Sequence, residues 1–310
     1  MIEADIGIAV ERASPFALED ERVYRRWRDA KLAIYPRGFG ELVVEVRDPR
    51  RLSDAERRKI LALCCRANMA ICASHCGNPI DASLARDLGV QLGLVRLDAN
   101  PLAGEDGVSA LEVAAEKAAR GYVPYSSRRL SWHTDGYYNP PPRRIRAFIL
   151  HCVRPAAEGG VNRLLDPEIA YILLREADPA HIRALSAPDV LTIPANTEGG
   201  VETRPAVAGP VFSIDVGGAL HMRYTARTRS IQWRADAATR AAVQCLEDVL
   251  AGDSPHVFAH RLAAGEALVC NNILHERSAF TEAPPGAPGR LIYRARYYDR
   301  VAGSLSDGRS

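Results

Sequence analysis

The spacing of apolar and polar residues predicts a series of short strands in the second half of the chain. The clearest covers residues 145–153, an almost unbroken apolar run that follows a loop of three prolines. Glycine-containing turn signals separate the later runs, at residues 189–194, 211–216, 266–270 and 291–298. Many short strands with irregular insertions favour a closed or double-sheet β core. A jelly roll fits this pattern, and a sandwich is the alternative.

Helical spacing occurs in both halves of the chain. Ser53 and Glu56 have the spacing of a capping box, in which the serine caps a helix and the glutamate follows three residues later. No repeat or linker divides the chain, so we predict one domain over residues 1–310. Its fold class is α+β, with a mainly helical or mixed part at 1–124 and a jelly-roll (double-stranded β-helix) core with flanking helices at 125–300. Helices are predicted at 18–33, 58–71, 108–119, 167–176 and 235–251, and a first strand at 41–47.

The composition narrows the class of partner. The chain has 310 residues, of which 47% are hydrophobic and 25% charged, as in an ordinary globular protein. Its 40 basic and 38 acidic residues leave a net charge of +2, which gives no global attraction to nucleic acid or membranes. No apolar run is long enough to span a bilayer, and the first residues lack the features of a secretory signal. We therefore expect a cytoplasmic protein that acts on a small molecule. The composition does not decide between a monomer and a homo-oligomer.

Cysteines and a histidine cluster early in the chain, as Cys64, Cys65, Cys72, His75 and Cys76. The total of seven cysteines is odd and does not indicate a disulfide framework. A zinc site is one alternative, but the spacing lacks the Cys-x-x-Cys pairs of common structural sites. Cys65, Cys72 and Cys76 recur at intervals of seven and four residues, which indicates one buried face of a helix. Cysteine packs there as a small hydrophobe.

The most informative motif is His133-Thr134-Asp135. Side chains two residues apart on an extended backbone point the same way, so the imidazole and the carboxylate could bind one metal ion. His275 lies far downstream, just after the predicted strand 266–270, and must come from a different strand. Together the three would form the two-histidine, one-carboxylate face of non-haem Fe(II) oxygenases. A His-x-Asp tripeptide alone is common, and His151, in the middle of a predicted strand, is interpreted as structural.

An arginine-rich run follows the Pro- and Gly-rich turn at residues 284–289. In a strand Arg290, Arg294 and Arg296 would share one face. A guanidinium group can bind a carboxylate through two parallel hydrogen bonds, which lysine cannot do. A dicarboxylic co-substrate would need such a residue near the metal. The alternative is a solvated basic edge strand.

A glycine turn follows the predicted strand 145–153. Gly159 and Gly160 let the backbone approach a ligand closely, and Asn162 could hydrogen-bond a carboxylate. A hairpin turn explains the same residues equally well.

Taken together, these motifs resemble those of Fe(II)/2-oxoglutarate-dependent dioxygenases, in the same order along the chain. The resemblance covers roughly residues 125–300 and is greatest to the branch similar to taurine dioxygenase and clavaminate synthase. The first 120 residues match only in length and helix content. The motifs are His133-x-Asp135, Gly159-Gly160-x-Asn162, His275 and Arg290-x-x-x-Arg294.

The resemblance implies the following site and reaction. His133, Asp135 and His275 would bind iron, and Arg290 would bind the far carboxylate of 2-oxoglutarate. A turn threonine often assists this arginine, and here Asn162 stands at the matching position, which is a departure. The implied cofactors are Fe(II), 2-oxoglutarate and O₂, and a small anionic or zwitterionic metabolite would be hydroxylated with release of succinate and CO₂. The alternatives are a metal-dependent hydrolase or lyase, and a non-catalytic sensor of metal or 2-oxoglutarate.

The residues beside the metal motif and the segment 221–227 are predicted to bind the substrate. Arg223 and Arg227, with Arg294, could hold a carboxylate, sulfonate or phosphonate. Tyr137 and Tyr138 could line the pocket, or attract a quaternary ammonium group by cation–π interaction. The alternative is that the tyrosines are packing residues. The pair Asn271-Asn272, just before His275, could orient the metal ligands.

Overall fold

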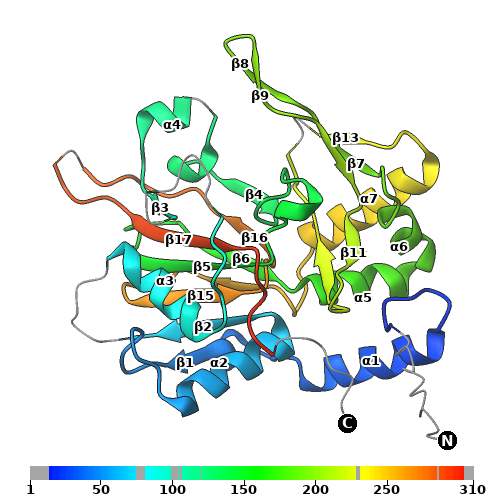
Figure 1. The fold of residues 1–310 in the computed structure, drawn as a ribbon, viewed down its shortest axis with the longest axis horizontal. Helices are drawn as coiled ribbons and strands as arrows, with labels where there is room; N and C mark the ends of the chain where they lie inside the picture. Colours follow the sequence, from blue (N-terminus) through cyan, green and yellow to red (C-terminus); the bar gives the residue numbers. More distant parts are fainter. Residues whose placement is uncertain are drawn as a thin grey trace, which may run out of the picture.

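The computed structural model describes residues 14–74, 81–98, 104, 107–119, 121–227, 231–284 and 286–303. Two large sheets face each other, helices cover their outer sides, and a long hairpin projects from one end (Figure 1). None of the helices in these ranges is long and apolar enough to cross a membrane.

The larger sheet has six strands in the order β1-β2-β15-β5-β17-β3. β1 and β2 are parallel, and every other neighbouring pair is antiparallel. Three of the six strands come from the first 124 residues, so the part predicted to be mainly helical is built into the same sheet as the core. The strands are β1 Val43–Glu45, β2 Met69–Ala73, β3 Val108–Leu111, β5 Ala147–Arg154, β15 Glu266–Cys270 and β17 Leu291–Tyr297.

The smaller sheet has four strands in the order β14-β6-β16-β4, all antiparallel. It lies against the larger sheet, since the His275 ring of β16 is 4.7 Å from the Phe148 ring of β5 between centroids. Its strands are β4 Leu130–His133, β6 Asn162–Leu165, β14 Phe258–His260 and β16 Leu274–Arg277.

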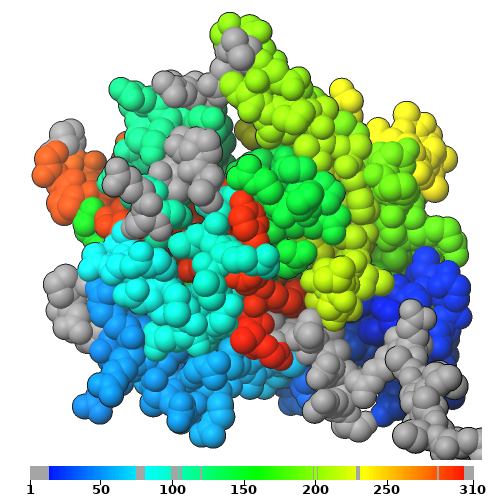
Figure 2. Space-filling model, viewed as in Figure 1, coloured from blue at the N-terminus to red at the C-terminus, as the bar shows by residue number. Residues whose placement is uncertain are grey.

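Three minor sheets extend the structure beside these two. The hairpin β8-β9 stands out from the molecular surface in Figure 2. The other two sheets have the orders β10-β7-β13 and β11-β12. Their strands are β7 Leu191–Ile193, β8 Asn196–Glu198, β9 Val201–Arg204, β10 Val207–Gly209, β11 Phe212–Ile214, β12 Leu220–Met222 and β13 Gln232–Trp233.

The helices fall into two groups around the sheets. α2 and α3 cover one face of the larger sheet, and their buried residues pack with Val44, Ile149 and Val269. α5, α6 and α7 pack on one another beyond the smaller sheet (Figure 1). The α-helices are α1 Glu21–Ile34, α2 Asp54–Ala67, α3 Ala82–Gln91, α4 Ala115–Ala119, α5 Pro167–Ala177, α6 Pro179–Leu185 and α7 Ala237–Ala251; the 3₁₀ helices are Phe39–Leu42, Val123–Tyr125 and Pro141–Arg143.

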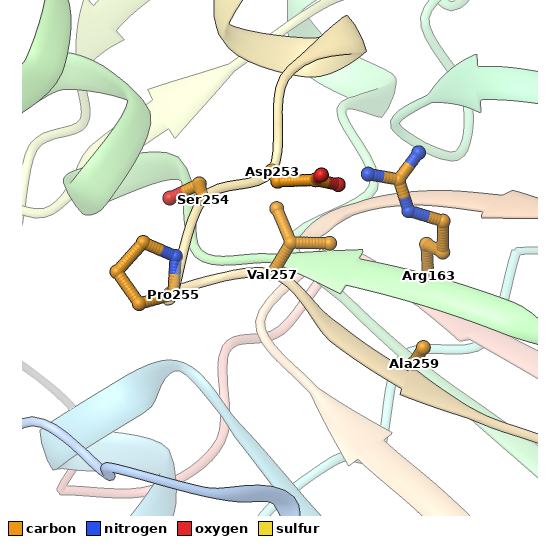
Figure 3. Close-up of a pocket in the computed structure, with 6 residues that line it drawn as sticks. All are labelled: Arg163, Asp253, Ser254, Pro255, Val257 and Ala259. Carbon is orange, nitrogen blue, oxygen red and sulfur yellow. The ribbon is translucent and has the colours of Figure 1, made fainter.

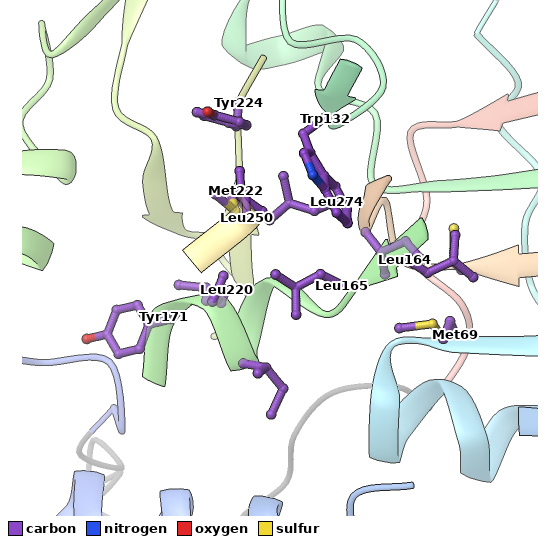
Figure 4. Packing of buried hydrophobic residues seen from close by; sticks show 14 of the residues in the cluster. Met69, Trp132, Leu164, Leu165, Tyr171, Leu220, Met222, Tyr224, Leu250 and Leu274 are labelled. Atoms are coloured by element: carbon purple, nitrogen blue, oxygen red, sulfur yellow. The ribbon is translucent and has the colours of Figure 1, made fainter. Parts of the chain in front are cut away.

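The main hydrophobic core joins residues that are distant in the sequence. Figure 4 shows Met69 of β2 near Leu164 of β6, with Trp132 and Leu274 of the adjacent strands β4 and β16 beyond them. Tyr171 of α5 and Leu250 of α7 belong to the same core. This packing fixes the strands that carry the motifs identified above.

The capping box predicted at the start of α2 is confirmed, because the Ser53 side chain accepts from the Glu56 N–H and Glu56 accepts from the Ser53 N–H. The predicted extent of the helix is wrong. It ends at Ala67, since Asn68 adopts the left-handed conformation (φ 57°), and β2 follows at once. Cys72 therefore lies in a buried strand rather than on a helix face shared with Cys65. His75 and Cys76 lie outside the described residues.

The helix predicted at 108–119 is also wrong in its first half. Residues Val108–Leu111 form β3, which pairs with β17, and only Ala115–Ala119 are helical. A strand of four residues is too short for its period to stand out from the helical spacing that follows. The other predicted helices and the five strand predictions in the second half coincide with observed elements, with shifts of a few residues at the ends.

Candidate metal centre and the arginines around it

His133, Asp135 and His275 meet on the inner face of the smaller sheet. β4 ends at His133, Asp135 lies two residues beyond, and His275 of β16 is the register partner of His133. Nε2 of His133 lies 3.7 Å from Oδ1 of Asp135, and the two imidazole centroids are 4.2 Å apart. Potential ligand atoms of all three side chains lie within 4.8 Å of one another. The strand pairing thus builds a two-histidine, one-carboxylate group.

Both imidazoles are held in a tautomer that leaves Nε2 available to a metal ion. Nδ1 of His133 lies 2.9 Å from the Ser131 carbonyl oxygen, and Nδ1 of His275 lies 3.1 Å from that of Ile273. A carbonyl oxygen only accepts hydrogen bonds, so each Nδ1 carries the proton and donates it. Each Nε2 therefore presents a lone pair.

The charges at the site also suit a cation. Burial, followed by the charge of His275, lowers the pKa of His133 to about 3, and burial lowers the pKa of His275, so both rings are neutral. Burial alone would raise the pKa of Asp135, but the charges of Arg294 and Arg296 outweigh it and hold the pKa below its usual range. Oδ2 of Asp135 is buried and has no hydrogen-bond partner. A buried orphan carboxylate oxygen beside two imidazole lone pairs fits a divalent metal ion.

Asn272 holds the backbone of Asp135. Its Oδ1 accepts from the Asp135 N–H at 2.8 Å, and its Nδ2 donates to the carbonyls of Asp135 at 3.0 Å and Ile145 at 2.7 Å. Asn272 itself has a φ of 49°, in the left-handed region that asparagine adopts more readily than most residues. The predicted orienting role therefore fits Asn272, whereas Asn271 bonds to Asn68 and to the Val301 N–H instead.

Substitution Asn272→Gly is expected to weaken Fe(II) binding about 10- to 100-fold, the usual effect of removing a group that orients a ligand. Glycine keeps the left-handed backbone and removes only the amide. Anaerobic titration calorimetry with Fe(II) measures the effect. Asn68→Gly is the matched control, because Asn68 is the other left-handed asparagine in the described residues. Equal loss of affinity in both variants would contradict the orienting role.

Two arginines of β17 point into the site. Nη1 of Arg294 lies 3.3 Å from Oδ1 of Asp135, and its Nε is buried without a partner. Arg296 donates to the hydroxyl of Tyr138 at 2.9 Å and pairs with the buried Asp98. β17 lies between β5 and β3. The alternative of a solvated edge strand is therefore wrong.

Arg290 precedes β17 and lies at the glycine turn. A Cβ built on Gly160, which has a φ of 67°, would lie 3.9 Å from Nε of Arg290, so this turn and the arginine are in contact. The guanidinium carbon is 5.3 Å from the centroid of the Phe280 ring. Burial lowers the pKa of Arg290 to about 10. No carboxylate in the described part of the chain bonds to it.

The sequence interpretation missed Arg277, which is 4% exposed at the end of β16. Burial, and then the charge of Arg290, lower its pKa to about 9. Its position two residues after His275 was the available signal, because alternate residues of a strand share a face. Its register partner on β6 is Asn162, whose Nδ2 lies 3.4 Å from the His260 carbonyl oxygen.

The aromatic residues after Asp135 border the site. Tyr137 and Tyr138 are half-buried, with ring centroids 5.2 Å apart in an edge-to-face arrangement. Arg227 is exposed and donates to the Tyr137 hydroxyl at 3.1 Å. The guanidinium of Arg204, on the projecting hairpin, lies 5.8 Å from the Tyr138 ring centroid. We call these four residues the rim of the site. Both tyrosines also pack against the main core, as the alternative interpretation expected, and their role toward a substrate stays a prediction.

Arg223 does not belong to that rim, and its predicted substrate role is wrong. Its guanidinium donates to four backbone carbonyls, those of Tyr137 at 2.7 Å, Val207 at 2.8 Å, Leu191 at 2.9 Å and Gly209 at 3.3 Å. These bonds use four of its five N–H groups. Arg223 therefore ties the segment after Asp135 to the sheet β10-β7-β13.

A separate hollow of about 330 Å³ is lined by Arg163, Ala259, Val257 and residues 253–255 (Figure 3). Arg163 pairs in register with Glu276, and both alternate with the inward-pointing His275, so this hollow is on the opposite face of the smaller sheet. Arg163 is already paired with Glu276 at 2.9 Å. The hollow is therefore separate from the metal centre.

Comparison with known sequences identifies the family. Residues 35–296 match the sequence model of the taurine catabolism dioxygenase TauD, TfdA family. The chain belongs to this family. The match begins well before residue 125, where the motifs had placed the start of the resemblance, so that expectation was too narrow. The longer match agrees with the three strands that the N-terminal part adds to the larger sheet.

Two curated relatives of this TauD, TfdA family member are uridine-5'-phosphate dioxygenases. The protein from Amycolatopsis sp. is 34% identical over 171 residues, which is 54% of this chain and 60% of the relative. The protein from Streptomyces sp. is 34% identical over 183 residues, which is 56% of this chain and 63% of the relative. The matched region thus spans less than two thirds of either relative.

Solved structures share the fold at low sequence identity. The non-heme iron oxygenase OrfP in complex with Fe, succinate and (3S)-hydroxy-L-Arg has a TM-score of 0.59 at 17% identity, with coverage of 91% of this chain and 90% of that one. Asparagine oxygenase in complex with Fe(II), 3-hydroxyasparagine and succinate has a TM-score of 0.57 at 16% identity, with coverage of 93% and 86%. These likenesses establish the fold of the TauD, TfdA chain rather than its substrate.

Proposed function

We propose that this protein is an Fe(II)- and 2-oxoglutarate-dependent dioxygenase that hydroxylates a small anionic metabolite and releases succinate and CO₂. The observation that carries the proposal is the buried triad of His133, Asp135 and His275. Two Nε2 lone pairs and an unpartnered carboxylate oxygen face one point. Family membership and the solved complexes with iron and succinate support the same chemistry.

The triad would hold the metal, and Arg290 would bind the far carboxylate of 2-oxoglutarate. Arg290 is suited to this task because it has a desolvated guanidinium and no carboxylate partner among the described residues. Asn162 lies on the strand that follows the glycine turn and could donate to the same carboxylate. The chemistry supplied by bound Fe(II) is oxidation by O₂ coupled to decarboxylation of 2-oxoglutarate.

The chain's own residues contribute geometry, charge and exclusion of water. Asn272 fixes the backbone of Asp135. Thr134, between His133 and Asp135, donates its N–H to the Tyr224 carbonyl at 3.0 Å and accepts from the Tyr224 N–H through its hydroxyl oxygen at 3.1 Å. Arg294 keeps Asp135 ionised and orients its Oδ1. An error of about 1 Å in such placement can cost about 100-fold in rate, so this support is functionally important.

The proposed substrate class is a nucleoside 5'-monophosphate, with uridine-5'-phosphate as the first compound to test. The names of the two curated relatives support this choice. At the rim of the site, Arg227 is a cation that suits an anionic substrate, and the rings of Tyr137 and Tyr138 offer stacking surfaces. Deeper in the site, Arg294 adds a positive charge beside Asp135.

The domain organisation and the location are part of the proposal. The two facing sheets are consistent with a jelly-roll, or double-stranded β-helix, core in a single domain. Because β1, β2 and β3 pair into the larger sheet, we extend that core into the first 124 residues. Cys64, Cys72, Cys152 and Cys270 are buried without disulfide bonds, which suits a reducing cytoplasm.

Anaerobic addition of Fe(II) and 2-oxoglutarate is expected to produce a weak visible charge-transfer band, and admission of O₂ with uridine-5'-phosphate is expected to release succinate. Adenosine-5'-phosphate and uridine are matched comparisons for the base and the phosphate. Absence of the band in metal-loaded protein would reject the dioxygenase. A band with no succinate release from any nucleotide would reject only the substrate class.

A further inference from the structure

Arg277, at the end of β16, and Arg290, just before β17, reach the same aromatic ring. The guanidinium carbon of Arg277 is 4.7 Å from the centroid of Phe280, and that of Arg290 is 5.3 Å from it. Phe280 is held by backbone pairing with the glycine turn, because Gly159 bridges to it and the Gly160 N–H donates to the Ala279 carbonyl at 3.1 Å. Two cationic groups are thus gathered at the turn beside Asn162.

Neither cation is neutralised by a carboxylate in the described part of the chain. Arg277 donates through Nη2 to the carbonyls of Ser126 and Arg128, and through Nε to that of Ser278 at 3.4 Å. Its Nη1 makes no hydrogen bond with any described residue. Two desolvated positive charges held close together repel each other, and an anion between them removes that repulsion.

The carbonyl contacts of Arg277 also orient it. They anchor one edge of the guanidinium to the segment before β4 and direct the remaining Nη1 group away from that segment. Arg277 lies two residues after His275 and therefore on the same face of β16 as the metal ligand. Its register partner on the neighbouring strand β6 is the buried Asn162.

We propose that Arg277 is a second arm of the co-substrate site, so that the far carboxylate of 2-oxoglutarate binds between two arginines, Arg277 and Arg290. This inference rests on the function proposed above and goes beyond it by adding a residue and a selectivity. Two guanidinium groups favour a dicarboxylic 2-oxo acid strongly over a 2-oxo acid with an apolar tail. Gly160, without a side chain, keeps the approach to Arg290 open.

The test compares two ligands on the Fe(II)-loaded protein under anaerobic conditions. 2-Oxopentanoate keeps the metal-chelating end of 2-oxoglutarate and lacks the far carboxylate. In Arg277→Met we expect the Kd of 2-oxoglutarate, measured by titration calorimetry, to rise about tenfold or more, which corresponds to the loss of a charge-assisted hydrogen bond. The Kd of 2-oxopentanoate is expected to stay the same.

Arg277→Lys covers the case in which the methionine variant does not fold. It keeps the charge and loses the planar fork, so the preference for 2-oxoglutarate should fall to an intermediate value. Arg261→Met is the matched control, because Arg261 also donates to backbone carbonyls, those of Ala156 and Ala157, but is exposed. It should leave both Kd values unchanged.

The outcomes separate this inference from the proposed function. A lower preference for 2-oxoglutarate in the Arg277 variants supports the two-arginine site. Equal weakening of both ligands, or no change in either, assigns Arg277 a purely structural role and overturns it. Failure of the wild-type protein to bind 2-oxoglutarate at all would overturn the proposed function and this inference together.

Discussion

Replacing His275 with alanine is expected to abolish Fe(II) binding at the triad, and with it succinate formation. Loss of a partner that only orients a ligand typically costs 10- to 100-fold in metal affinity, so loss of a ligand should cost about 100-fold or more. His133 and Asp135, the other two members of the triad, remain in this variant, but they cannot complete the metal-binding face alone. Anaerobic calorimetry with Fe(II) measures the affinity, and succinate assays measure the turnover.

His181→Ala is the control for this experiment. His181 lies on α6 and is not among the residues that gather at the metal centre. The protein should bind Fe(II) normally when it is replaced. If His275→Ala retained the wild-type affinity for Fe(II), the triad would not be the metal centre.

Arg290→Met is expected to raise the KM for 2-oxoglutarate about 100-fold while leaving the free energy of unfolding unchanged or higher. The arginine carries a desolvated charge that no carboxylate in the described residues compensates, so methionine removes a cost to the folded state. In the proposed function, the same guanidinium makes the bidentate contact to the co-substrate, which methionine cannot make. Steady-state kinetics and urea denaturation of the metal-free protein measure the two effects.

Arg294→Met provides the contrast. Replacing Arg294 removes the cation that pairs with the buried Asp135 carboxylate, so the metal-free protein should become less stable. If Arg290→Met destabilised the protein as much as Arg294→Met and left the KM unchanged, Arg290 would be structural. The pair thus distinguishes an arginine kept for a ligand from one kept for an internal ion pair.

The three residues of the candidate metal centre could be predicted from the sequence, because their arrangement depends on a short spacing and on one pair of strands. His133 and Asp135 are two residues apart, and His275 follows a recognisable strand. The structure brings the three together through one register pair of β4 and β16. The shared face of Arg294 and Arg296 could be predicted for the same reason, since a strand repeats every two residues. That this face is buried became evident only from the structure.

Other features depend on distant neighbours and could not be predicted in this way. Arg223 lies in a segment rich in groups that can bind anions, but its guanidinium is occupied by four backbone carbonyls from three separate segments of the chain. Residues 69–73 continue the apolar pattern of α2, and only the left-handed turn at Asn68 converts them to a strand. The hydrogen-bond partners of Arg277 could not be seen in the sequence, because the Ser126 and Arg128 carbonyls that accept from it lie about 150 positions earlier.

The order of the strands in the larger sheet determines when this protein can complete its folding. Met69 of β2 pairs with Cys270 of β15, about 200 positions later in the chain, and both neighbours of β5, the strands β15 and β17, lie far downstream of it. Until they emerge from the ribosome, β5 has two open edges, which are a risk for aggregation. His275 lies between β15 and β17 and emerges with them. The edges of β5 in a nascent chain therefore stay open until the segment that completes the candidate metal centre has been synthesised.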